Sequence, residues 1–228
     1  MRCGLALRYR LAMLFICVAV AASAAVEKPD SLVRGLFLSL SDSQLGILPK
    51  TTRQDMLDYL DADSLATRPN AFRGDAYIVR SSKDFLEVRL SNVSTLQIKE
   101  LPASKGVLLM TVYTIRGEGV PADSEVNFFD SSFRQLKREK ILPLPDPAKF
   151  WNIGHLPKEE RDRLRHEIDA IAFYSLAYTA SPLDCNLNAT VTLDDYLTQE
   201  QIKELEPYLD SRLQWLWDGK KFKLIHNS

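Results

Sequence analysis

Cysteine is scarce in this chain of 228 residues, which contains three. Cys3 and Cys17 lie in the first two dozen residues, so Cys185 is alone if that segment is removed. The remaining protein could then form no intramolecular disulfide, and its hydrophobic core must supply its stability. Cys185 is also a weak candidate nucleophile, because its neighbours Asp184 and Asn186 provide no base and a nearby carboxylate disfavours the thiolate.

Histidine and glycine are scarce as well, with three and nine copies. His155, His166 and His226 include no pair four residues apart and have no cysteine partner, so no zinc site is predicted. The acidic segment 61–65 departs from the calcium-loop pattern at its third position. There is no Gly-x-Ser-x-Gly elbow, Ser-x-x-Lys motif or glycine-rich phosphate loop. The sequence therefore predicts no catalytic residue, no metal and no cofactor.

Positive charge is not in excess either. The formal net charge is −1, and residues 1–24 contain Arg2, Arg8 and Arg10 but no acidic residue. The rest of the chain has 26 basic and 30 acidic side chains, a net charge of −4. Because no basic tract or stripe remains, nucleic acid is not a predicted partner. The length and an apolar content of 46% allow one large or two small soluble domains.

Residues 1–24 have the three parts of a secretory signal peptide. The arginines form a positive n-region, Leu11–Ala22 is a short apolar run, and Ala22-Ser23-Ala24 is a cleavage signal, which makes Ala25 the first mature residue. An uncleaved membrane anchor is the alternative, but the apolar run is too short to span a bilayer comfortably. Lipidation would need Cys17, which has no small residues before it. We therefore expect an exported protein without stable membrane insertion after signal cleavage.

The strongest local pattern is an aromatic hairpin at Leu213–Ile225. Asp218-Gly219 lies between two alternating runs and predicts a two-residue turn. The expected register makes three cross-strand pairs: Trp217 with Lys220, Trp215 with Phe222, and Leu213 with Leu224. Both tryptophans, Phe222 and the leucines then share one face. Phe128–Leu136 is similar, with aromatic residues on both sides of an Asp-led turn.

Residues 25–141 are interpreted as a first unit of helix plus antiparallel sheet. Val26–Ser39 is interpreted as a lead-in with short apolar groups, and a helix is expected to begin at Thr51 as N-cap, with Gln54 completing a capping box. Four strands are then predicted by alternation: Ala76–Arg80, Phe85–Ser91, Thr95–Leu101 and Val107–Arg116. The last of these is apolar on both faces, which predicts a central strand covered on both sides.

Residues 142–151 form a Pro-rich junction, and residues 152–228 repeat the same order of elements. Leu156-Pro157-Lys158 repeats Leu48-Pro49-Lys50 and opens a helix over Lys158–Ile168. Strands at Ala170–Thr179 and Leu187–Leu193, a helix capped by Thr198 and Gln201, and the aromatic hairpin follow. The predicted fold is α+β, with two similar units, each of one or two helices packed on an antiparallel sheet. Divergent duplication and a chance likeness both remain open.

Four aromatic residues are the candidate binding residues: Phe150, Trp151, Trp215 and Trp217. On the hairpin or at the junction they could contact a peptide, a glycan or another envelope protein. Packing in the core is the alternative, because aromatic cross-strand pairs ordinarily face the core.

Several segments resemble an uncharacterised family of exported Bacteroidetes proteins, a domain-of-unknown-function family. The resemblance is carried by five stretches: Leu48–Asp58, Ser94–Ile98, Phe128–Phe133, Pro143–Phe150 and Leu216–Phe222. It implies location in the periplasm or on the cell surface of a Gram-negative bacterium, and it provides no catalytic residues to transfer. The helix-and-sheet repeat is also similar to the tandem fold of beta-lactamase inhibitor proteins, a likeness of fold alone.

The sequence as a whole favours a non-enzymatic binding or scaffold protein of the cell envelope, with a protein or an envelope polymer as partner. A hydrolase of envelope polymers with paired carboxylates is the alternative, since such pairs need only proximity in space. Asp194, Asp195 and Glu118 are acidic residues that could serve. A purely structural envelope protein is a third reading.

Overall fold

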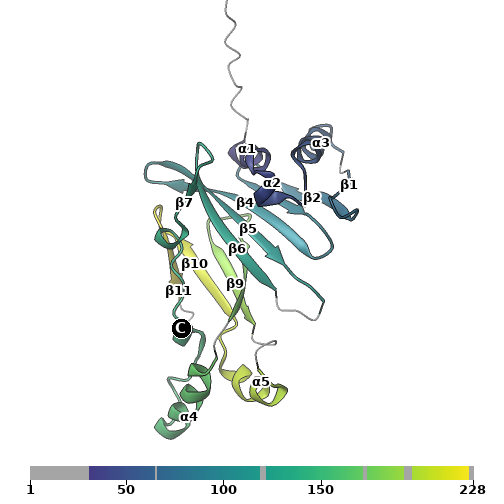
Figure 1. Ribbon diagram of the computed structural model, residues 1–228. Helices are drawn as coiled ribbons and strands as arrows, with labels where there is room; N and C mark the ends of the chain where they lie inside the picture. The colour runs from purple at the N-terminus through teal and green to yellow at the C-terminus, as the bar shows by residue number, and fades with distance from the viewer. Residues whose placement is uncertain (1–30, 65, 119–121, 172–173, 193–196, 226–228) are drawn as a thin grey trace, which may run out of the picture.

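Two antiparallel sheets form the framework of the molecule (Figure 1). The computed structural model describes residues 31–64, 66–118, 122–171, 174–192 and 197–225. The larger sheet has seven strands in chain order: β1 (Arg68–Pro69), β2 (Asp75–Ser81), β3 (Phe85–Arg89), β4 (Ser94–Ala103), β5 (Gly106–Ile115), β6 (Asp123–Asp130) and β7 (Gln135–Leu136). The smaller sheet has the order β11-β10-β9-β8, with these bounds: β8 (Ser175–Ala180), β9 (Leu187–Thr192), β10 (Arg212–Trp217) and β11 (Phe222–Ile225).

The α+β class is confirmed, and the two sheets fit two similar units. The four strands predicted between Ala76 and Arg116 correspond to β2 to β5, with ends shifted by at most two residues. The unit boundaries at 25–141, 142–151 and 152–228 remain predictions. The expected signal peptide, residues 1–24, lies outside the described residues.

The larger sheet is covered on both faces, as the apolar residues on both faces of β5 predicted. Leu109 of β5 belongs to a core formed with α1 (Leu32–Ser39) and α3 (Lys50–Asp61) on one face. Met110 and Val112 belong to a second core that includes the smaller sheet. Because side chains alternate along a strand, β5 can contribute to both cores at once.

The first helix lies in the segment Val26–Ser39, which was interpreted as a lead-in with no helix assigned to it. Helix α1 occupies most of its described part and buries Val33, Leu36 and Phe37. These positions are three or four residues apart, which is the spacing of one helical face. The helix is short, and its stability comes from this burial rather than from a capping side chain, since Ser31 makes no cap hydrogen bond. A short α2 (Asp42–Leu45) follows.

The N-cap of helix α3 lies two residues before the predicted Thr51, and the capping box at Thr51 and Gln54 is wrong. Its N-cap is Pro49, which is held at φ −53° and ψ 150° and makes no side-chain cap hydrogen bond. A proline fixes its own φ in the range that a helix entry needs, so the chain turns into the helix at that point. The buried guanidinium of Arg53, in the first turn, donates to the carbonyl oxygens of Phe37 and Leu40 at the end of α1.

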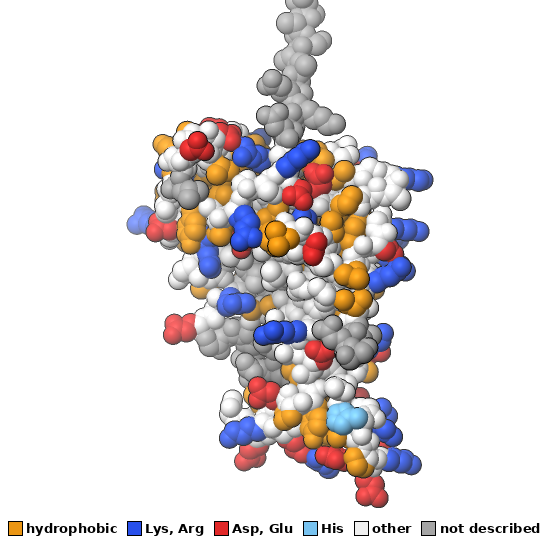
Figure 2. Space-filling view, turned by 180° about the vertical axis from the view of Figure 1, so that it is seen from behind, with side chains coloured by type: hydrophobic (Ala, Val, Ile, Leu, Met, Phe, Trp, Pro, Cys, Tyr) orange, Lys and Arg blue, Asp and Glu red, His pale blue; other side chains and the backbone are white. Residues whose placement is uncertain are grey.

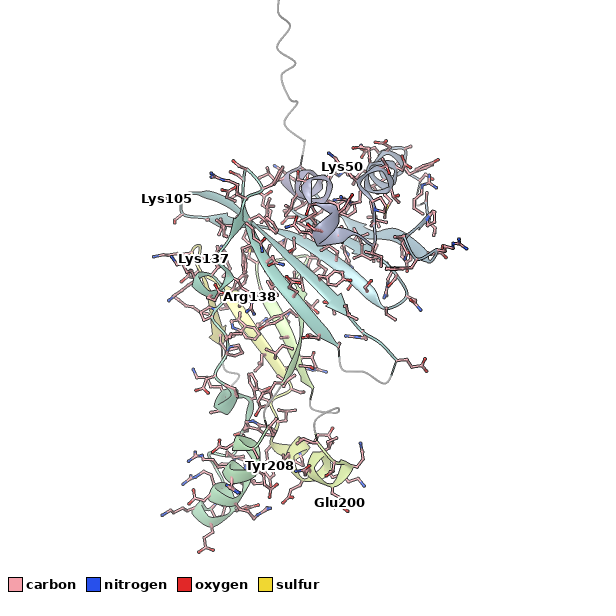
Figure 3. All side chains as sticks on the ribbon, in the orientation of Figure 1. Lys50, Lys105, Lys137, Arg138, Glu200 and Tyr208 are labelled. Carbon is pink, nitrogen blue, oxygen red and sulfur yellow. The ribbon has the colours of Figure 1, made fainter. Side chains whose placement is uncertain are left out.

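Two helices lie at one end of the smaller sheet, far from α1 and α3 (Figure 1). They are α4 (Lys158–Asp169) and α5 (Gln199–Leu205). The predicted capping box of Thr198 and Gln201 is present. Arg163 of α4 forms an ion pair with Glu204 of α5. Tyr208 lies beside both helices (Figure 3), and its hydroxyl donates to Glu160 over 3.3 Å. The strand predicted at Ala170–Thr179 begins only at Ser175, because Ile171 still bonds back to the end of α4.

The smaller sheet meets the larger one through the edge of β8. The backbone N–H of Ala180 donates to Oε1 of Gln97 on β4 over 2.9 Å, and the N–H of Tyr178 donates to Oγ of Ser124 on β6 over 3.0 Å. Thr114 of β5 donates to the Tyr178 carbonyl oxygen over 3.4 Å. Side chains on the face of one sheet therefore satisfy the backbone groups of the other sheet's edge.

The C-terminal hairpin is present, but its predicted register is wrong by two residues. Trp217 pairs with Phe222, and Trp215 pairs with Leu224. The connection has four residues, because the Asp218 carboxylate accepts the backbone N–H groups of Lys220 and Lys221 and holds a wider loop. Gly219, at φ 88°, provides the left-handed conformation in that loop. A shift of two residues leaves every side chain on its predicted face.

Surface charges are mixed in sign. On the face seen in Figure 2, Lys and Arg side chains are interspersed with Asp and Glu, and no basic stripe crosses the view. Among the helices that the structure describes, each is too short or too polar to traverse a lipid bilayer.

Candidate functional site

The four aromatic residues predicted to bind a partner are largely in the core. Phe150 and Trp215 are each 1% exposed, Trp151 is 7% exposed, and Trp217 is half-buried. Phe150 meets Tyr174 edge-on at 5.2 Å between ring centroids, and Trp215 meets Tyr178 at 5.5 Å. Their main role in this conformation is packing, and among them only Trp151 lines the pocket described next.

A pocket of about 530 Å³ lies where the Pro-rich junction passes α4. Six of its lining residues carry charged or hydrogen-bonding groups: Asp146, Trp151, Arg161, Arg165, Asp169 and Tyr174. The others are small or apolar and include Pro147, Ile153, Ile168 and Ile171. We call this site the α4 pocket. Its volume is within the range of small-molecule sites, and an apolar lining with a few polar groups is their usual composition.

One wall of the α4 pocket is a stripe along α4. Arg161, Arg165 and Asp169 are spaced four residues apart, and Ile168 lies beside them. The helical period therefore places all four residues on one side of α4. The Arg161 guanidinium donates to the Gly154 carbonyl oxygen over a long 3.4 Å. The exposed Arg165 makes no hydrogen bond or ion pair with the described residues. Both guanidinium groups therefore have donors available for a ligand.

The opposite wall is formed by the junction. Asp146 accepts the backbone N–H of Ala148 over 3.0 Å and so caps the 3₁₀ helix Pro147–Phe150. The chain then pairs with residues 208–210, through a bridge between Trp151 and Leu209. The Asn152 N–H donates to the Tyr208 carbonyl oxygen over 2.7 Å. This short ladder fixes the backbone on both sides of Trp151.

Trp151 has an unsatisfied polar atom. Its indole N–H is buried and makes no hydrogen bond of normal geometry with the described residues, although the Tyr174 hydroxyl is near enough to act as a poorly aligned acceptor. Burial raises the pKa of the neighbouring Tyr174 hydroxyl, and the negative charge of Asp169 raises it further. The nearby Trp151 N–H acts in the opposite direction, because it can donate to the Tyr174 oxygen and so favours the phenolate. The phenol is therefore neutral near neutral pH and able to donate. Buried donors in folded proteins nearly always have a well-aligned partner, so the poorly satisfied Trp151 N–H beside the pocket is a donor that a ligand acceptor could complete.

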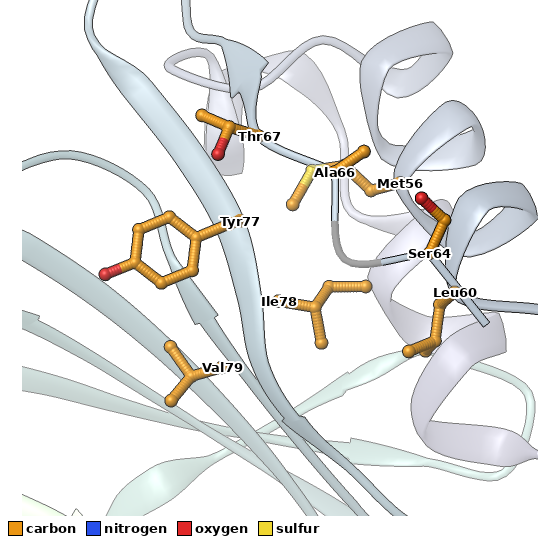
Figure 4. A pocket seen from close by; sticks show the side chains of 8 residues that line it. All are labelled: Met56, Leu60, Ser64, Ala66, Thr67, Tyr77, Ile78 and Val79. Carbon is orange, nitrogen blue, oxygen red and sulfur yellow. The ribbon is translucent and has the colours of Figure 1, made fainter.

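A second hollow, of about 300 Å³, lies between α3 and β2 (Figure 4). Its eight lining residues are uncharged: Met56, Leu60, Ser64, Ala66, Thr67, Tyr77, Ile78 and Val79. The β2–β3 register shifts between Ile78 and Arg80, an irregularity that interrupts a sheet edge and hinders strand addition. With no charged group and no regular edge, this hollow is the weaker candidate.

Within the described ranges, no cluster of three or more His, Cys, Asp or Glu side chains is arranged to hold a metal ion. Asp194 and Asp195 lie outside those ranges. Glu118 does not line the α4 pocket.

Sequence reasoning missed Arg161, Arg165 and Tyr174. The stripe along α4 was visible as polar residues four apart on a helix whose buried side carries Leu164 and Ile168. Tyr174 was not visible as a site residue, because only the folded chain brings it beside Trp151.

The fold and the pocket define an α+β protein of two antiparallel sheets with a ligand-sized site beside the junction. The chain belongs to the family described as "Protein of unknown function (DUF3256)", which matches residues 29–222. It is also similar to a solved domain of an uncharacterised protein from Porphyromonas gingivalis W83, a member of the Bacteroidetes. The identity is 18% and the TM-score 0.70, over 86% of this chain and 99% of that one, which shows a shared fold. No curated protein matches the chain significantly.

Proposed function

We propose that this chain is an exported, non-enzymatic binding module of the bacterial cell envelope, and that it engages its partner through the α4 pocket. The proposal rests chiefly on one observation: a ligand-sized pocket lined by a residue whose buried N–H makes no hydrogen bond of normal geometry with the described residues. Leaving such a donor unpaired costs about 1 to 3 kcal/mol, which a ligand acceptor would recover. The sequence of residues 1–24 supports export, and the partner is a protein or an envelope polymer.

A photo-cross-linking amino acid at Ala148 tests this function. Ala148 is exposed and lines the α4 pocket, so a bound partner lies within reach of its side chain. Cells that produce this variant are irradiated and fractionated. A specific adduct is expected in the envelope or periplasmic fraction, and Arg165→Gln in the same chain should reduce it. The control position is Leu183, which is 93% exposed and does not line the pocket. Equal adducts at both positions, or protein retained in the cytoplasm, would contradict the proposal.

The hydrolase alternative has one observation in its favour, since two carboxylates, Asp146 and Asp169, line the same pocket. Against it, Asp146 already accepts a backbone N–H as a helix cap. The two readings are distinguished by incubating the purified protein with isolated peptidoglycan and envelope polysaccharide. Release of soluble fragments that is lost in both Asp146→Asn and Asp169→Asn would favour the hydrolase. Unchanged polymers support the binding module.

A further inference from the structure

We infer that the ligand of the α4 pocket is a monocarboxylate with a ring-shaped body, such as an acidic sugar or an aryl carboxylate. This inference deepens the proposed function and rests on it. Four side chains that carry hydrogen-bond donors line one site: Arg161, Arg165, Trp151 and Tyr174. Such a set calls for a ligand rich in acceptor oxygens, and arginine binds planar carboxylates particularly well.

The charges of the residues that line the pocket favour a ligand with one negative charge over a ligand with several. The positive charges of Arg161 and Arg165 are balanced by Asp146 and Asp169, so the pocket has no net positive charge. Asp169 also lies one helical turn beyond Arg165 on the same wall. A phosphate, with nearly two charges, would be repelled by these carboxylates more strongly than a single carboxylate.

The apolar lining explains the ring. Ile153, Ile168 and Ile171 form much of the remaining surface, and the Trp151 and Tyr174 rings also line it. Aromatic faces and aliphatic side chains are apolar surfaces against which a flat ring can be buried. A volume of about 530 Å³ holds one ring with its substituents rather than an ion alone.

The Trp151 indole N–H provides a direct test by nuclear magnetic resonance. The chain has three tryptophans, so a spectrum of the ¹⁵N-labelled protein contains three indole signals, and the one lost in Trp151→Phe is that of Trp151. Phenylacetate and glucuronate are titrated as the aryl and sugar probes. Saturable shifts of the Trp151 signal are expected, with dissociation constants on the order of millimolar for ligands of this size. The signals of Trp215 and Trp217 should stay in place and report an intact fold.

Variants of the two arginines test whether the ligand carboxylate binds at the α4 wall of the pocket. Arg161→Gln and Arg165→Gln should each weaken phenylacetate or glucuronate binding about tenfold, the effect of losing one charged hydrogen bond at a partly exposed site. Lys158→Gln is the matched control: it removes one positive charge from the same helix outside the pocket and should leave affinity unchanged.

Three results would overturn the inference. Inorganic phosphate could shift the Trp151 signal as strongly as the carboxylates, in which case the site selects anions in general. Uncharged 2-phenylethanol could bind as well as phenylacetate, which would remove the role of the arginines while the binding function stands. Finally, neither carboxylate could move the signal, in which case the Ala148 cross-link decides the proposed function independently. If only one of the two carboxylates binds, that result supports the inference and identifies the aryl or sugar source.

Discussion

The indole Nε1 of Trp217 donates a 2.6 Å hydrogen bond to the carbonyl oxygen of Pro102, which ties the closing hairpin of the smaller sheet to the end of β4, beside the β4–β5 turn of the larger one. The same turn is bonded again, since the Ser104 N–H donates to the Gly219 carbonyl oxygen over 3.1 Å. Phe222 reaches further and approaches Phe128 of β6, with 6.1 Å between ring centroids. The two aromatic hairpins that were recognised separately in the sequence therefore meet in one core.

Trp217→Phe should lower the free energy of unfolding by about 1 kcal/mol. The substitution keeps an aromatic ring against Phe222 but removes the hydrogen bond to Pro102, and bonds of this kind contribute about that amount. Urea denaturation followed by circular dichroism measures the change. Leu216→Ala, on the exposed side of the same strand, is the control and should have a smaller effect. An unchanged midpoint for Trp217→Phe would show that ring packing alone fixes the hairpin.

Arg53→Met should lower the free energy of unfolding by about 3 kcal/mol. The Arg53 side chain is fully buried, and its removal leaves the carbonyl oxygens of Phe37 and Leu40 without their donor. Chemical denaturation is again the measurement.

Arg34→Met is the matched control for Arg53, because Arg34 lies on α1 itself and pairs with Asp61 at the surface. An exposed pair of this kind contributes less than about 1 kcal/mol. Equal losses for the two variants would mean that charge, rather than the buried carbonyl groups, explains the effect.

Much of the larger sheet could be predicted from alternation, because each strand has a period of two and β5 is apolar on both faces. The hairpin register could not be predicted, because loop length depends on whether the Asp218 carboxylate accepts nearby backbone N–H groups. Helix α1 was missed because a short helix without a cap is stabilised by tertiary burial rather than by local sequence.

The α4 pocket could be predicted only in part. Its α4 wall follows from residues four apart in one helix. Its other wall combines Trp151 and Tyr174 with the ladder to residues 208–210, and no local pattern specifies those contacts. The contact between the two sheets could not be predicted either. In the sequence, Gln97 and Ser124 are ordinary polar residues of alternating strands, and only the folded chain places β8 beside them.

Acid should destabilise the protein partly through Asp218. The Lys221 backbone N–H, followed by the Lys223 side chain, lowers the pKa of Asp218 from 3.8 to about 2. A carboxylate with a lowered folded-state pKa contributes stability that is complete above the unfolded-state value and is lost as the pH falls through about 2. Asp218→Asn should therefore be less stable than the natural protein above about pH 4, and the difference should shrink as the pH approaches 2.

Thermal unfolding across that pH range measures the effect of Asp218→Asn. Asp55→Asn is the control, since Asp55 is exposed on α3 and makes no hydrogen bond or ion pair with the described residues. A stability difference for Asp218→Asn that stays constant down to low pH would refute the linkage.

Gln97→Leu should loosen the contact between the sheets at one identified amide. The side-chain amide oxygen Oε1 of Gln97 accepts the buried Ala180 N–H, and leucine has a similar size but no acceptor. The orphaned N–H should cost about 1 to 3 kcal/mol, and hydrogen exchange at Ala180 should become faster. Ser124→Ala is the reciprocal variant, because Ser124 accepts the Tyr178 N–H. Site-resolved exchange should then show Ala180 most affected in the first variant and Tyr178 in the second. If both variants instead accelerate every amide equally, the two side chains stabilise the whole fold and do not hold the β8 edge locally.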